Sequence, residues 1–182
     1  SIEQSDVCIL LIDASKGLTK QDLTIFYQIV DQKKGVVIAV NKWDLIQKDG
    51  KTHTEFYDTI KASLAPFNDV PIIFTSNITK QRILKTLEVA IQVYENRRNK
   101  VSTSKLNEVM LEIIESNPPP AIKGKYVRIK YVTQIPAKYP AIAFFCNLPQ
   151  YIKDPYRRFL ENKLREKFDY KGVPIKIYFR KK

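Results

Sequence analysis

The residue types and spacing that can hold a guanine base occur together at Asn41, Lys42, Trp43 and Asp44. They follow an apolar run, Val36–Val40, with the composition of a strand buried on both faces. An ionised Asp44 carboxylate has two acceptor oxygens, which match the N1–H and 2-amino donors of guanine. Asn41 can hydrogen-bond to the base edge, and the stem of Lys42 can lie along the base. Adenine lacks this pair of donors, so the pattern favours guanine.

A second polar segment, Thr75-Ser76-Asn77, ends the next apolar run, Pro71–Phe74. The carboxyl ends of neighbouring parallel strands meet at one edge of a sheet, where open α/β folds bind ligands. A backbone N–H from Ser76 or Asn77 could therefore reach O6 of guanine. The alternative is a pair of polar strand ends that only form turns. Two signals at matching strand ends favour the base site.

The chemistry for phosphate transfer is missing from the sequence. There is no G-x-x-x-x-G-K-[ST] loop to cradle phosphates and Mg²⁺, and five glycines offer no substitute. His53 is the only histidine, so neither a zinc cluster nor a His-based catalytic triad is expected. We expect no catalytic residue and no metal ligand here, and we expect that the chain alone does not hydrolyse GTP.

The first half of the chain alternates between strand and helix patterns, which predicts an α/β fold with a parallel sheet covered by helices on both faces. The expected strands cover residues 7–13, 36–40 and 71–74. The expected helices begin at Thr19, at a capping box over Thr52–Glu55, and at Thr79.

The second half has a different order, α-β-β-α-β, which indicates a small α+β domain. Its expected elements are a helix capped by Thr103, strands over Tyr126–Val132 and Ala141–Asn147, a helix opened by Asp154-Pro155, and a strand over Ile175–Arg180. The polar segment Asn96–Lys100 marks the boundary, so domains are expected at residues 1–98 and 99–182.

Positive charge is concentrated in the second domain. Residues 1–100 hold 14 Lys and Arg against 12 Asp and Glu, whereas residues 101–182 hold 17 against 7, out of a net charge of +12. Such an excess is typical of nucleic-acid-binding modules. In the expected strands Val127, Ile129 and Tyr131 alternate with polar residues, so the opposite sheet face carries the RNA-binding candidates Arg128, Lys130, Lys176, Tyr178 and Arg180. That face could instead be merely solvated, or dock on a G domain.

Several spaced motifs resemble the EngA/Der family, bacterial GTPases with two tandem G domains and a KH-like domain. The resemblance rests on "DASKGLTKQD" at residues 13–22, on "NKWD" at 41–44, and on four C-terminal motifs: "PPP" at 118–120, "VRIKY" at 127–131, "YRRFL" at 156–160 and "GVPIKI" at 172–177. It covers essentially all 182 residues. It implies a partial P-loop-GTPase-type sheet followed by a KH-like domain, and a chain that is a piece of a longer protein.

The resemblance also implies a function. The site for the guanine base of GTP or GDP would comprise Asn41, Lys42, Asp44, Ser76 and Asn77. The Mg²⁺ that accompanies the nucleotide would be held by G-domain portions of the parent protein that are missing here. Large ribosomal subunit RNA is the implied partner, in the bacterial cytoplasm, and no apolar run is long enough for a membrane helix. The alternatives are a non-enzymatic RNA-binding module with a G-domain remnant, and an Era-like KH GTPase. We also expect self-association through strand 7–13, whose usual neighbour is absent.

Overall fold

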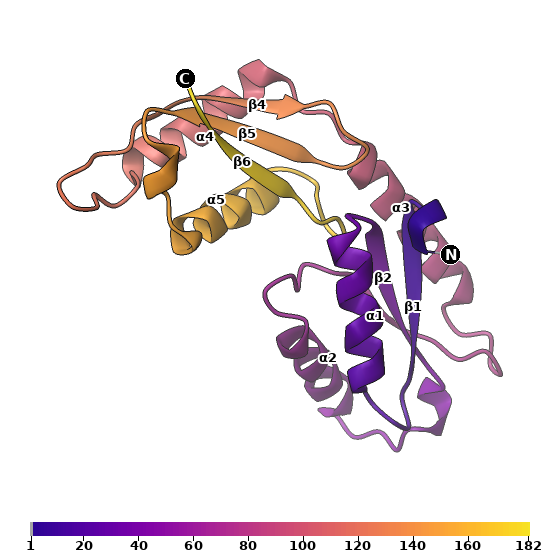
Figure 1. The fold of residues 1–182 in the computed structure, drawn as a ribbon. Coiled ribbons are helices and arrows are strands. Elements are labelled where there is room, and N and C mark those ends of the chain that lie inside the picture. The colour runs from indigo at the N-terminus through magenta and orange to yellow at the C-terminus, as the bar shows by residue number, and fades with distance from the viewer. Residues whose placement is uncertain (1) are drawn as a thin grey trace. The chain divides into compact units, whose positions relative to one another are not determined.

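The computed structural model describes residues 2–182, which form two compact units (Figure 1). Unit 1 comprises the described residues up to Arg97 together with a short later segment, Lys171–Pro174. Unit 2 comprises Arg98–Tyr170 and Ile175–Lys182. The chain therefore returns to unit 1 between the last helix and the last strand of unit 2.

Unit 1 is built on a three-stranded parallel sheet in the order β1-β2-β3, which confirms the predicted α/β fold. Its elements are η1 (Ile2–Gln4), β1 (Val7–Asp13), α1 (Lys20–Asp31), β2 (Gly35–Asn41), η2 (Trp43–Leu45), α2 (Thr52–Ser63), β3 (Ile72–Phe74) and α3 (Ile83–Arg98). The central strand β2 is buried from Gly35 to Val40, as its unbroken apolar sequence predicts.

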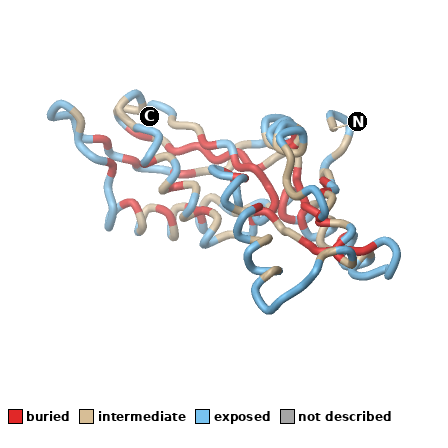
Figure 2. The backbone as a smooth tube through the Cα atoms, turned by 90° about the horizontal axis from the view of Figure 1, so that it is seen from below, coloured by how far each residue is buried: buried red, intermediate tan, exposed pale blue. Residues whose placement is uncertain are grey.

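Helices cover both faces of this sheet. Side chains of α1 and α2, among them Phe26 and Ile60, share one buried cluster with Ile38 of β2. On the other face Val93 of α3 packs in a cluster with Val37 of β2. Figure 2 shows the buried positions inside the molecule, with the outermost loops exposed. β1 is an edge strand, because no described residue pairs with its outer side.

Two of the predicted helix starts in unit 1 are wrong. The capping box at Thr52 does not form. The Asp49 carboxylate accepts from the N–H groups of Lys51 and Thr52 at 2.8 and 2.9 Å, and Thr52 is already the first residue of α2 and not its cap. Thr79 does not cap α3, which begins at Ile83. By contrast, Thr19 caps α1 in a complete capping box with Asp22.

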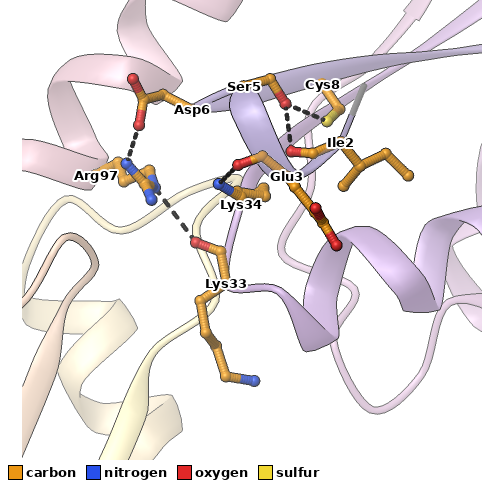
Figure 3. A network of polar contacts seen from close by, with 8 residues as sticks. All are labelled: Ile2, Glu3, Ser5, Asp6, Cys8, Lys33, Lys34 and Arg97. Atoms are coloured by element: carbon orange, nitrogen blue, oxygen red, sulfur yellow. Dashed lines mark hydrogen bonds and ion pairs between the residues drawn. The ribbon is translucent and has the colours of Figure 1, made fainter.

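A buried arginine joins the end of α3 to the start of β1 (Figure 3). The Arg97 guanidinium, with 5% of its side chain exposed, lies 2.6 Å from the Asp6 carboxylate and donates to the Lys33 carbonyl at 3.3 Å. Nearby, Lys34 donates to the Glu3 carbonyl at 2.8 Å. These contacts fix the N-terminal end of the sheet, opposite the end where the guanine motif lies.

Unit 2 has a second sheet, order β4-β5-β6, in which β4 is antiparallel and β6 parallel to β5. The predicted α-β-β-α-β order is confirmed by α4 (Thr103–Ser116), β4 (Ile129–Ile135), β5 (Ala141–Cys146), α5 (Asp154–Lys167) and β6 (Lys176–Lys181), with a short η3 (Pro149–Tyr151) before α5. Both helices lie on one face, where Leu106, Met110, Leu160 and Leu164 pack in one cluster with residues of all three strands.

Three details of unit 2 differ from the sequence-based expectation. A β-bulge at Lys130 shifts the register between Ile129 and Tyr131, so Tyr131 lies on the face away from the helices and not with the apolar residues. Ser102, not Thr103, caps α4, since its side chain accepts from the Lys105 N–H. Asp154 is the first residue of α5 and not its cap.

Both cysteines, Cys8 and Cys146, are free thiols. Cys146 is fully buried, whereas Cys8 is only partly so. Over the described residues, no helix is both long and apolar enough to cross a membrane. Nor do residues 2–182 contain a group of three or more His, Cys, Asp or Glu side chains placed to hold a metal ion.

Candidate functional site

An ion pair lies where β1 and β2 end side by side. Lys42 follows β2 with a left-handed backbone (φ 61°), and its Nζ lies 2.7 Å from Oδ2 of Asp13, the last residue of β1. The N–H and hydroxyl of Ser15 donate to the other carboxylate oxygen at 3.0 and 2.6 Å. The hydrogen bond from Lys42, followed by those from Ser15, lowers the pKa of Asp13 to about 2. Asp13 therefore fixes the ammonium of Lys42.

Trp43 anchors the motif to the protein interior. Its side chain is buried, with its ring centroid 4.4 Å from that of Phe74 and 5.4 Å from that of Phe56. The backbone N–H of Trp43 donates to the Thr75 carbonyl at 3.1 Å, and the backbone N–H of Thr75 donates to the Val40 carbonyl at 2.8 Å. The structure thus brings together the two strand ends that the sequence predicted, and Trp43 has a packing role.

Two oxygen atoms of the motif are buried without a hydrogen-bond partner among the described residues: Oδ1 of Asn41 and Oδ1 of Asp44. Leaving such an atom unpaired costs about 1–3 kcal/mol, and more for a charged group. Such unpaired atoms are uncommon in natural proteins, and each calls for an explanation. A bound guanine would supply its N1–H and 2-amino donors to Asp44, so the unpaired Asp44 oxygen fits the predicted ligand.

Ser76 and Asn77 differ in what they can offer a ligand. Ser76 is buried; its N–H donates to the Gln81 carbonyl at 3.3 Å, and its hydroxyl accepts from the Thr79 N–H at 3.2 Å. Asn77 is exposed, and no acceptor within residues 2–182 takes its backbone N–H. Of the two N–H groups considered from sequence, that of Asn77 is therefore the available one.

The sheet face of unit 2 that is turned away from the helices carries aromatic rings flanked by cations. Tyr178 has the Arg180 guanidinium 5.6 Å and the Lys176 ammonium 5.8 Å from its ring centroid. Tyr131 and Phe145 form a second ring pair, with centroids 5.7 Å apart. The sequence did not predict that Tyr131 and Phe145 lie on this face. The bulge that turns Tyr131 outward has no local signal, and Phe145 has the pattern of a buried residue of β5.

The remaining RNA-binding candidates lie at the start of β4. Lys130 occupies the bulge and is exposed. Arg128 precedes the strand; its side chain is exposed, and its N–H donates to Oδ1 of Asn147 at 2.8 Å. All five predicted cationic or aromatic residues are therefore at least partly accessible, and they come from both edge strands of the sheet.

Comparison with protein families finds two matches, one in each half of the chain. The family described as "Elongation factor Tu GTP binding domain" matches residues 1–96. The family described as "KH-domain-like of EngA bacterial GTPase enzymes, C-terminal" matches residues 100–180.

Curated relatives align over the whole chain, and all those described here are named GTPase Der. The protein of Flavobacterium johnsoniae is 56% identical over 182 residues, that of Flavobacterium psychrophilum 57% over 182, and that of Bacteroides fragilis 57% over 184. This chain spans 42% of the length of each. A solved structure of Era with MgGDPNP and nucleotides 1506–1542 of 16S ribosomal RNA covers 99% of this chain and 66% of its own, at 16% identity and a TM-score of 0.40, too low to support an inference.

Proposed function

We propose that the first unit of this chain binds the guanine base of GTP and GDP. The reason is that the chain belongs to the EngA/Der family of bacterial GTPases. Asp44 would accept from N1–H and the 2-amino group, Asn41 would pair with the base edge, and the N–H of Asn77 would meet O6. The ion pair with Asp13 holds the Lys42 side chain at the site before any ligand arrives.

The observation that carries this proposal is the pair of buried, unpaired oxygens on Asn41 and Asp44. Neither has a partner in the described chain, and both belong to the motif of residues 41–44. If this segment were only a turn with no ligand, two buried acceptors without hydrogen-bond partners would lower its stability for no benefit. Exposed or paired side chains would cost less free energy on folding.

A specificity exchange tests the base site. Asp44→Asn removes the acceptor for the 2-amino group of guanine but offers an amide donor to the C2 carbonyl of xanthine. We expect GDP binding to weaken and XDP binding to strengthen, measured by the fluorescence of Trp43, the only tryptophan. Asp58→Asn, an exposed substitution on α2 with the same charge change, should leave both affinities unchanged. Equal preference of the wild-type chain for GDP and ADP would overturn the proposal.

Nucleotide binding by this chain alone should be weak, and hydrolysis absent. Base contacts are present, but the sequence has no phosphate loop whose backbone N–H groups, lysine and hydroxyl would hold the phosphates and Mg²⁺. GTP hydrolysis is thus proposed for the longer protein, with this chain supplying guanine specificity. Mg²⁺-dependent GTP turnover that co-purifies with the wild-type chain and is lost in Asp44→Ala would contradict this assignment.

The second unit, we propose, contacts RNA through its open sheet face. Lys176 and Arg180 supply cations for phosphates, while Tyr131, Phe145 and Tyr178 supply rings on which unpaired bases can stack. We expect the double variant Lys176→Glu/Arg180→Glu to lose affinity for a short single-stranded RNA in an anisotropy titration. Lys105→Glu, on the helix side of the unit, is the control for charge alone.

For the whole protein, this combination supports a ribosome-assembly role, with large-subunit RNA as the partner in the bacterial cytoplasm. The two matched families favour it over the Era-like alternative, because the C-terminal match is to the EngA KH-like domain. The non-enzymatic alternative would require that the guanine site be unused, which the specificity exchange tests directly.

Self-association of this chain is a further part of the proposal. β1 is an edge strand whose Ile9 and Leu11 side chains are 37% and 61% exposed. An unpaired strand with exposed apolar residues is a template for another chain. We propose that a second copy pairs there at high concentration.

A further inference from the structure

A tight hairpin projects from unit 2 between α4 and β4 (Figure 1). Ile122 and Lys125 exchange both backbone hydrogen bonds, at 3.1 and 2.9 Å. The two residues between them, Lys123 and Gly124, have φ angles of 51° and 71°. A two-residue loop with both central residues at positive φ is a type I′ turn. The tip is therefore a defined structure and not an arbitrary loop.

The residue at the first central position breaks the local rule. Asn, Asp and Gly are strongly preferred there, because they tolerate a left-handed backbone, whereas a lysine pays a steric cost. Residues that break such a rule without a structural gain are concentrated at functional sites. Lys123 is exposed and has no hydrogen bond or ion pair within the described chain, so its side chain brings no structural gain.

The chain on either side of the hairpin is held in place. Five residues before Ile122, the Asn117 carbonyl accepts from the hydroxyl of Tyr156 at 2.8 Å. At its end, the side chain of Asn147 bridges the strand-like segment after the hairpin: its Nδ2 donates to the Tyr126 carbonyl at 3.0 Å, and its Oδ1 accepts from the Arg128 N–H at 2.8 Å. The tip is thus presented from a fixed base, which lowers the entropy cost of binding.

The charge of the surrounding chain is of one sign. Between Glu115 and Asp154 the sequence has no Asp or Glu, but six Lys and Arg. Lys123, Lys125 and Arg128 are all exposed, and the Tyr126 ring beside them is 70% exposed. No ion pair among the described residues engages these three cations. The hairpin therefore offers unneutralised positive charge next to an accessible ring.

We propose that this hairpin, residues 122–125, is a second RNA contact, a finger that binds phosphates of the RNA backbone through Lys123 and Lys125. Lysine is a point charge on a flexible stem, suited to phosphates and not to reading bases. The finger therefore adds affinity without sequence preference. The inference rests on the proposed RNA binding by unit 2, and extends it to residues on a different segment from the open sheet face.

The turn itself provides a test that separates binding from folding. Lys123→Asn places the preferred residue at the left-handed position, so the thermal midpoint of unfolding should stay the same or rise. The same substitution removes one phosphate contact. We expect Lys123→Asn/Lys125→Gln to bind RNA about tenfold more weakly at moderate salt and to reduce the slope of log affinity against log salt by about 1.5. Lys105→Gln on α4, which has the same charge change per site, is the matched control.

The probes are a short single-stranded RNA and an RNA duplex, both titrated by anisotropy. Loss of the finger should weaken both to the same extent, whereas Tyr178→Ala on the sheet face should weaken only the single strand. If Lys176→Glu/Arg180→Glu abolishes binding but the finger variant binds like wild type, the proposed RNA contact of the finger is wrong, whereas RNA binding by the sheet face is retained. A wild-type chain that binds neither RNA overturns both. Binding of the finger to anionic vesicles, with RNA affinity unchanged in its variant, would also overturn it.

Discussion

The N–H of Val36, near the start of β2, donates to the carbonyl of Gly172 at 2.8 Å, although the two lie 136 positions apart in the chain. The Gly172 N–H in turn donates to the Asp69 carbonyl at 2.7 Å. Val173 beside it is fully buried against Val37 and Val93. A four-residue segment from late in the sequence is thus a structural part of unit 1, at the end of β2 opposite Asn41.

Gly172→Ala should therefore destabilise unit 1 strongly. A Cβ at this position would lie 2.6 Å from a Val93 methyl group and 3.0 Å from the Val36 carbonyl oxygen, in a backbone with φ +77°. Steric strain in the backbone and overpacking together predict a loss of roughly 2–4 kcal/mol in unfolding free energy. Gly17→Ala is the matched control, because φ is +67° and nothing lies within 4 Å of the added Cβ, so only about 1 kcal/mol should be lost. Equal losses in urea unfolding would refute the close packing.

A chain ending at residue 98 should be less stable than unit 1 within the full chain. It would lack the bond to Val36 and would leave the pocket of Val173 open, a loss of about 2–3 kcal/mol from the side chain alone. Adding a peptide of residues 169–176 should raise its melting temperature, with the logarithm of peptide concentration once that exceeds the dissociation constant. No effect of a saturating peptide would count against the contribution of this segment.

Breaking the Arg97–Asp6 ion pair should cost more unfolding free energy than breaking an ion pair that is exposed on both sides. Arg97 has 5% of its side chain exposed, so Asp6→Ala would leave a buried guanidinium with one partner fewer, at a cost of roughly 1–2 kcal/mol, reduced because Asp6 itself is 54% exposed. Glu88→Ala breaks a pair exposed on both sides and should cost less than about 0.5 kcal/mol. Chemical denaturation of both variants measures the difference; the idea fails if Glu88→Ala costs as much as Asp6→Ala.

The pKa of Asp13 should respond to Lys42. Lys42 is the first cause of the fall to about 2, and Ser15 the next, so Lys42→Met should move the pKa only part of the way back to its ordinary value of 3.8. Because the pKa is lowered by folding, the stabilisation from Asp13 is complete above pH 4 and is lost as the pH falls towards 2. Carboxyl ¹³C NMR titration measures this directly. An unchanged pKa in the variant would show that Ser15 alone sets it.

The sequence predicted what depends on local pattern. The unbroken apolar run of β2 indicated a buried parallel strand, and the strand–helix alternation indicated the parallel sheet. The base-site motif was visible because its residue types and its place after β2 are both local. Asp13, which holds Lys42, could also have been found, since parallel register places the last residues of β1 and β2 side by side.

What the sequence did not predict depends on contacts between distant segments. The bulge at Lys130 reverses the side on which Tyr131 lies, and it follows from the pairing of β4 with β5 and not from the residues of β4. The position of Gly172 in unit 1 depends on its contact with the start of β2, which is far away in the sequence and has no local signal. The expected capping box is absent because the Asp49 carboxylate accepts from the N–H and the hydroxyl of Thr52, which would otherwise have capped the helix.

Self-association through β1 is the last prediction. Leu11 is 61% exposed on an edge strand, and α3 exposes Leu84, Leu87 and Ile91 as well. A charge on an edge strand opposes pairing with a second copy, so Leu11→Glu should shift the chain from dimer or larger species to monomer in light scattering across a concentration series. Leu45→Glu, at a comparable exposure of 62% in η2, is the control and should leave the mass unchanged. If the wild-type chain is monomeric at the highest concentration, or if both variants reduce association equally, β1 is not the interface.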